Sequence, residues 1–203
     1  MTDLTVEPRI SVNPTSIGRK PLGWWGIVML IVTEGTIFAL LLFANFYLRA
    51  NNHPWPPPGV EKPKLLISGI RSFILWGSSI PAVLAERALR RNNLRRFRTM
   101  IVITLVMATI FMAGHIQEYI EVSRKLTPTS NAYGSSFFTI TGLHAIHLLI
   151  GMVVLGYLLV QSLRGRYDPG RSRTGVTCGI LYWHFVDAVW LAVYPSLYLS
   201  VTW

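Results

Sequence analysis

The sequence contains little charge and almost no cysteine. Of its 203 residues only 14% are charged and 51% are hydrophobic, whereas an ordinary soluble domain is roughly 25% charged. The single cysteine, Cys178, excludes an intrachain disulfide, a cysteine-ligated zinc site and an all-cysteine iron–sulfur cluster made by this chain alone. This composition excludes a soluble enzyme and any chemistry that needs paired thiols.

The sequence also lacks repeats and long polar segments. We find no internal repeat of fixed period and no inverted repeat, which disfavours a secondary transporter. The connections between the apolar runs are short, and one of them, residues 53–59, is too rich in proline to be helical. No soluble domain fits between the runs.

Long apolar runs dominate what is present. A helix rises about 1.5 Å per residue, so crossing a hydrocarbon layer of roughly 30 Å takes about 20 residues. Because the first run is too long for a signal-peptide core, we expect it to be retained as an anchor. The sequence predicts an all-α integral membrane bundle of five transmembrane helices in residues 22–203, after a polar tail in residues 1–21. The predicted spans are 22–48, 64–89, 98–122, 133–163 and 175–203.

Basic residues predict the orientation of the bundle. The 19 Lys and Arg outnumber the nine Asp and Glu, and most of them lie in the N-terminal tail and in the segments 87–98 and 164–173. Since Lys and Arg are retained on the cytoplasmic side, we expect a multi-pass membrane protein with a cytoplasmic N-terminus and an external C-terminus. The basic loops are expected to contact anionic lipid headgroups. Charge divided among membrane-tethered loops argues against a nucleic-acid partner.

Several ionisable residues fall inside the predicted spans, and eight of them lie near the middle of the bilayer or about one turn from it. Placing a charged side chain near the bilayer centre costs at least ~2.5 to 3.5 kcal/mol. We therefore expect each of these residues to have a partner in the protein or a function. Pairs three residues apart share one helix face, which we expect to point into the bundle. The eight are Glu34, Arg71, His115, Glu118, His144, His147, His184 and Asp187.

Two readings of these residues remain open and are compatible. In the first, they join helices that have no hydrophobic drive to associate, with Glu34 meeting His147 or His184. In the second, Glu34 also takes part in a proton relay, because a carboxylate with a histidine partner inside a membrane can pass protons.

The second acid, Glu118, is expected to meet Arg71, His115 or His144. Arg71 either pairs with Glu118 or extends to the outer surface.

The four membrane histidines also raise the possibility of haem. Two histidines on facing helices can ligate one haem iron, here one of His144 and His147 with one of His115 and His184. Since each has a carboxylate or arginine at similar depth as an alternative partner, we expect pairing within the protein and no metal site in this chain. Zinc or copper would need three or four converging ligands.

Several strings of residues carry a family resemblance. They run from Val32 to Phe38, from Gln117 to Tyr119, from Tyr133 to Gly151 and from Tyr182 to Leu191. The motif residues singled out in these strings and in the loop after the first span are Trp55, Pro56, Pro57, Tyr133, Gly134, Gly142, Tyr182, Trp183 and Trp190. Together the strings closely resemble subunit III of cytochrome c oxidase, in a short five-helix bacterial form without the first two helices of mitochondrial versions.

The resemblance implies a subunit of the respiratory complex that reduces dioxygen to water and pumps protons. It implies a location in a bacterial inner membrane, haem and copper in partner subunits and none here, and bound phospholipid. The implied partners are subunits I and II and small helical subunits. It also implies that Glu34 is the family's membrane glutamate and Glu118 its second buried acid.

Rival hypotheses are a subunit of a quinol oxidase or nitric oxide reductase, a membrane cytochrome and a proton-coupled transporter.

Overall fold

The computed structural model describes residues 21–57, 65–124, 126–167 and 173–200. Five helical segments are long and apolar enough to cross a membrane, which confirms the predicted all-α fold with five spans. Most of the predicted tail and residues 201–203 lie outside the described residues. The elements are α1 (Leu22–Asn51), α2 (Leu65–Gly77), α3 (Ser79–Arg90), α4 (Leu94–Ser123), α5 (Ala132–Leu163), α6 (Thr174–Tyr194) and one π-helical turn, η1 (Pro195–Leu199).

Two of the five spans are interrupted near a proline. The second span is α2 followed by α3, with Ser78 between them. Pro81 has no N–H to donate to the carbonyl of Gly77, which explains why the regular helix is broken there. The fifth span changes from α-helix to a π-helical turn at Pro195 for the same reason. In the second span the break places two serines, Ser78 and Ser79, beside α6.

Local hydrogen bonds account for the tight turn between the second and third spans. Asn92 adopts a left-handed conformation with φ of 56°, which asparagine tolerates better than most residues. The side chain of Asn93 then accepts a hydrogen bond from the backbone N–H of Arg96 at 2.9 Å, as an N-cap. The helix therefore begins at Leu94, one turn before the predicted start at Arg98.

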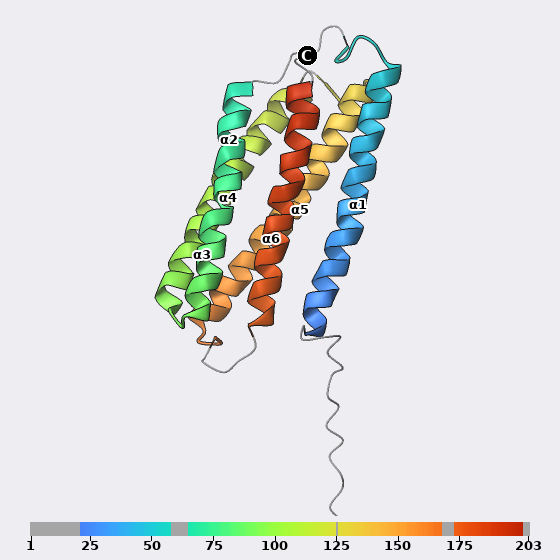
Figure 1. The fold of residues 1–203 in the computed structure, drawn as a ribbon. Coiled ribbons are helices and arrows are strands. Elements are labelled where there is room, and N and C mark those ends of the chain that lie inside the picture. Colours follow the sequence, from blue (N-terminus) through green and yellow to red (C-terminus); the bar gives the residue numbers. More distant parts are fainter. Residues whose placement is uncertain (1–20, 58–64, 125, 168–172, 201–203) are drawn as a thin grey trace, which may run out of the picture.

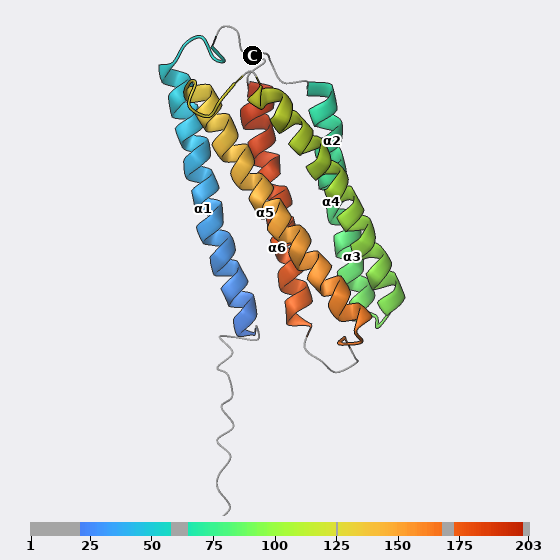
Figure 2. The same cartoon turned by 180° about the vertical axis from the view of Figure 1, so that it is seen from behind.

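The helix α6 lies at the centre of the bundle (Figures 1 and 2). It packs against α1, α2, α3 and α5, and the ring of Trp190 meets Phe111 of α4 with centroids 5.1 Å apart. More than half of its most apolar stretch, 56%, is buried within the bundle, whereas the corresponding share of α1 is 6%. The core is thus organised around α6, and α1 is a peripheral helix.

Candidate functional site

The carboxylate of Glu34 on α1 contacts the imidazole of His147 on α5. Glu34 Oε2 lies 3.1 Å from His147 Nε2, and His147 Nδ1 lies 2.8 Å from the carbonyl oxygen of Leu143. The ring of Phe38 packs edge-on against His147, with centroids 5.2 Å apart. Of the two partners predicted for Glu34, the structure brings it to His147.

This geometry restricts where protons can sit. A carbonyl oxygen only accepts hydrogen bonds, so the contact with Leu143 requires a proton on His147 Nδ1. The contact between Nε2 and Glu34 then needs one further proton, carried either by the imidazole or by the carboxyl group. Whether the imidazole or the carboxyl group carries it, one proton lies between Glu34 Oε2 and His147 Nε2. A proton can move between its two partners without breaking the contact.

The second acid pairs with the arginine of the second span. Arg71 Nη2 on α2 donates to Glu118 Oε2 on α4 at 2.8 Å, and Arg71 Nη1 donates to the carbonyl of Gly114. The side chains of Arg71 and Glu118 are 16% and 14% exposed, so this is a largely buried ion pair. The predicted pairing of Arg71 with Glu118 is confirmed, and the alternative of an arginine extending to the surface is wrong.

The third polar contact joins α3 to α6 through a serine. Ser79 Oγ donates to Asp187 Oδ2 and lies 3.0 Å from His184 Nδ1. Because the serine has only one proton, His184 Nδ1 is the donor in the second contact. His184 and Asp187, one turn apart on α6, are thus tied to the same hydroxyl. Sequence reasoning did not identify Ser79.

His144 does not have the charged partner that we predicted for it. It is fully buried, and neither ring nitrogen has a hydrogen-bond partner among the residues that the structure describes. Its ring stacks on the indole of Trp190 at a centroid distance of 4.7 Å and meets Phe111 edge-on. The prediction of a carboxylate or arginine for each histidine is therefore wrong at His144. Aromatic side chains fill the space around the ring, leaving no room for one.

His115 is also buried without a charged partner. Its ring stacks on Phe111 with centroids 5.9 Å apart, and it hydrogen-bonds the backbone of Thr141. Its Nε2 atom has no hydrogen-bond partner within the described part of the chain. The imidazole is therefore held by packing and one backbone contact. Of the three alternatives predicted for Glu118, the structure shows Arg71 and not His115.

Further hydrogen bonds between helices were not predicted, and three of them involve serine hydroxyls. The indole N–H groups of Trp183 and Trp190 on α6 donate to Ser78 at 3.0 Å and to Ser72 at 2.9 Å. Toward the C-terminal end of α1, the buried amide oxygen Asn45 Oδ1 accepts a hydrogen bond from Ser136 Oγ on α5 at 2.8 Å. The isolated asparagine in the first apolar run was the one signal in the sequence that could have revealed such a bond.

The remaining motif residues serve packing and turns. The ring of Trp55 packs edge-on against Tyr133 with centroids 5.3 Å apart, which holds the loop after α1 over the start of α5. A Cβ at Gly134 would lie 2.7 Å from the carbonyl oxygen of Thr127, so only glycine fits there. A Cβ at Gly142 would meet only an ordinary contact, 3.6 Å from Tyr119.

Two other motif positions lie beside these contacts. The hydroxyl of Tyr182 lies 3.4 Å from the carbonyl oxygen of His147. Pro56 and Pro57 are half-buried in the loop.

The polar side chains are distributed over separate contacts. In the parts of the chain that the structure describes, no three His, Cys, Asp or Glu side chains come together as ligands for one metal ion. The arrangement can join helices and hold protons. That no cofactor binds to this chain stays a prediction.

Comparison with known proteins agrees with these features. A model of the family described as cytochrome c oxidase subunit III matches residues 1–202. The chain is 34% identical to cytochrome c oxidase subunit 3 of Synechocystis sp., over 90% of this chain and 77% of that protein. It is 29% identical to the subunit 3 of Thermostichus vulcanus, over 86% and 85%, and to that of Papio hamadryas, over 97% and 76%. The chain therefore belongs to the cytochrome c oxidase subunit III family.

Proposed function

We propose that this chain is a scaffold subunit of an aerobic terminal oxidase in a bacterial inner membrane. It stabilises the catalytic subunit I, contacts subunit II, and supports proton uptake and the access of oxygen and lipid during the reduction of dioxygen to water. The haem and copper centres belong to the partner subunits. The observation that supports this role is that polar contacts inside the spans join one helix to another, as Glu34 joins His147.

The proton role rests on the position of Glu34. Its side chain is 31% exposed, on a helix that is otherwise little buried, while its partner His147 is 9% exposed. The carboxylate can therefore exchange protons with groups outside this chain and pass them to the imidazole. A carboxylate that served only to hold α1 in place would not need to be accessible.

The proton role can be tested in the intact oxidase with Glu34→Gln. The amide keeps the size of the side chain and one hydrogen bond to His147, but it cannot take up a proton. We expect normal assembly and a normal initial rate of oxygen consumption, followed by faster loss of activity during sustained turnover. Thr36→Val is the control, because Thr36 is exposed on the same helix and its hydroxyl donates to the carbonyl of Val32.

An unchanged turnover lifetime in a well-assembled Glu34→Gln oxidase would rule out the proton role. The scaffold role is tested separately by purifying the assembly in mild detergent and identifying its other chains. A copper-binding domain on the accompanying subunit II would indicate cytochrome c as the electron donor. A Soret absorption band in this chain purified alone would contradict a subunit without haem.

A further inference from the structure

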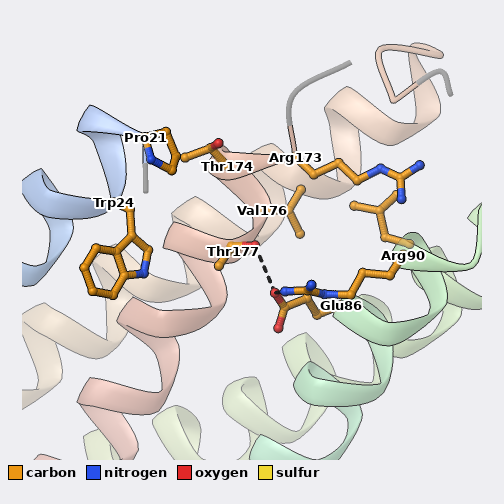
Figure 3. Close-up of a pocket in the computed structure, with 9 residues that line it drawn as sticks. Pro21, Trp24, Glu86, Arg90, Arg173, Thr174, Val176 and Thr177 are labelled. Atoms are coloured by element: carbon orange, nitrogen blue, oxygen red, sulfur yellow. Dashed lines mark hydrogen bonds and ion pairs between the residues drawn. The ribbon is translucent and has the colours of Figure 1, made fainter. Parts of the chain in front are cut away.

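A cavity of about 490 Å³ opens at the end of the bundle where α1 and α6 begin and α3 ends (Figure 3). Pockets that hold small ligands have volumes of roughly 300 to 1,000 Å³, so the cavity is large enough for one. It is separate from the polar contacts described above, and none of its residues belongs to the motifs that carry the family resemblance. It is therefore a candidate site of its own.

The cavity has an aromatic side and a charged side. In Figure 3 Trp24 lies on the α1 side, whereas Glu86 and Arg90 of α3 lie on the opposite side. Arg173, which precedes α6, extends its guanidinium toward the α3 side as well. A ligand that fills the cavity therefore needs a flat apolar part at one side and a charged part at the other.

One carboxylate holds one of the two arginines in place. Glu86 Oε1 accepts hydrogen bonds from Arg90 Nη2 at 2.8 Å and from the hydroxyl of Thr177 at 2.9 Å. The side chain of Arg90 is nevertheless 66% exposed. A guanidinium carries five N–H donors, so Arg90 keeps donors for a ligand that arrives from the water at this end.

The second arginine makes the charged side positive. Arg173 Nη2 donates to the amide oxygen of Asn92, which orients the guanidinium without neutralising it. The two arginines and Glu86 together carry two positive charges and one negative charge. The charged side of the cavity therefore favours an anion.

The surface around the cavity favours an anion with several negative charges. No exposed Asp or Glu lies in the described residues of α3 or in the first turn of α4. The exposed basic residues there are Arg87, Arg91, Arg95 and Arg96. Clustered charges of one sign raise the local concentration of oppositely charged ligands, and the effect grows with the charge of the ligand.

The indole of Trp24 distinguishes between classes of anion. An inorganic phosphate would use the arginines and leave the aromatic side without a role. A nucleoside polyphosphate uses both sides, because nucleic acid bases stack on aromatic side chains and arginines bind phosphate oxygens through paired N–H groups.

We propose that this cavity binds a nucleoside polyphosphate such as ATP. The phosphates lie between Arg90 and Arg173, and the base stacks on Trp24. The ligand thereby joins the peripheral helix α1 to α3 and α6. The proposal goes beyond the proposed function and rests on it only in placing the chain in an oxidase.

The test uses the intact oxidase in nanodiscs of phosphatidylcholine, with an ATP analogue that carries a photoreactive azide on its base. Illumination attaches the base to the segment that lies next to it. Mass spectrometry of the peptides then measures the label on the segment that contains Trp24. The concentration of the analogue that gives half of the maximal label measures the affinity.

Three variants separate the charges of the cavity from those around it. With Arg173→Gln we expect the half-saturating concentration to rise about tenfold, from one lost arginine contact. With Glu86→Gln we expect it to fall roughly threefold, because a negative charge is removed while an oxygen remains for Thr177. Tighter binding cannot result from misfolding. Arg95→Gln removes a charge outside the cavity and is expected to change the concentration by less than about twofold.

Several results would overturn the proposal. One is no label on the segment that contains Trp24, and another is an unchanged half-saturating concentration in both Arg173→Gln and Glu86→Gln. Protection by tripolyphosphate as effective as that by ATP would show that the base is not recognised. Loss of the label when phosphatidylglycerol replaces phosphatidylcholine would show that a lipid occupies the cavity.

Failure of this proposal is distinguishable from failure of the proposed function. Subunit composition and oxygen consumption are measured on the same samples. An oxidase that assembles and turns over normally but is not labelled contradicts only the nucleotide site. A purified oxidase that does not contain this chain contradicts the proposed function, whether or not a nucleotide binds.

Discussion

The side chain of Arg71 occupies the space that a Cβ atom at Gly114 would fill. The same arginine donates to the carbonyl of Gly114 and to the carboxylate of Glu118, one turn further along α4. The ion pair between α2 and α4 therefore depends on a residue that has no charge and no side chain. Helix α4 provides both the acid that holds the arginine and the gap through which the arginine reaches it.

Gly114→Ala is expected to destabilise the protein by about 1 to 3 kcal/mol, because the added methyl group overlaps Arg71 and forces the arginine away from Glu118. Thermal unfolding of the purified oxidase measures the effect. The matched control is Gly156→Ala in α5, where a Cβ would have no neighbour within 4 Å. If both variants unfolded at the same temperature, the steric argument would be wrong.

A double-mutant cycle measures the coupling between Arg71 and Glu118. Arg71→Gln and Glu118→Gln each leave one largely buried charge without its partner. The unpaired charge adds its own penalty, so each single variant is expected to be destabilised by more than the lost contact alone. The double variant removes both charges, and we expect a coupling energy of about 0.5 to 3 kcal/mol. If the single variants fold and the coupling energy is zero, the ion pair does not stabilise the protein.

Ser79→Ala is expected to destabilise the junction of α3 and α6 by about 1 to 3 kcal/mol. Among the described residues, Asp187 Oδ1 already lacks a hydrogen-bond partner, and the substitution would leave its other oxygen without one as well. Ser79→Ala/Asp187→Leu should recover much of the loss, because it removes the buried acceptor. Ser196→Ala serves as the control, since the hydroxyl of this half-buried serine donates to the carbonyl of Ala192 in the same span and not to another span.

The predicted orientation can be tested by thiol labelling. In a Cys178→Ser background, Arg91→Cys and Thr129→Cys place one thiol in exposed turns at opposite ends of the bundle. If the N-terminus is cytoplasmic, a membrane-impermeant maleimide labels only the Thr129→Cys variant in spheroplasts and only the Arg91→Cys variant in inverted vesicles. The reverse pattern would place the N-terminus outside.

The five spans could be predicted because the signal is physical and simple. A run of about 20 apolar residues has no other stable place than a bilayer or a large core, and the runs here are separated by turns with proline or asparagine. The ends were less accurate. Leu94 begins a helix whose first turn is basic and exposed, and hydropathy does not detect a helix that extends beyond the apolar layer.

The partners of the buried polar residues were only partly predictable. Two histidines three residues apart on α5 share a face, so the sequence could not decide which helix each of them meets. A small rotation directs His147 to Glu34 and His144 to Trp190. Serine was overlooked because it is common in membrane helices and carries no charge, yet Ser72, Ser78 and Ser79 all bond to α6.

The central position of α6 has a consequence for how the protein is made. Because α6 follows the other spans in the sequence, the ribosome inserts it after them, and until then Ser72 and Ser78 lack the indole donors that they meet in the finished bundle. The earlier spans can already make the contacts that they share, such as the ion pair between Arg71 and Glu118, but not those with α6. Closure of the bundle is thus a late event in biogenesis, set by the arrival of a single segment.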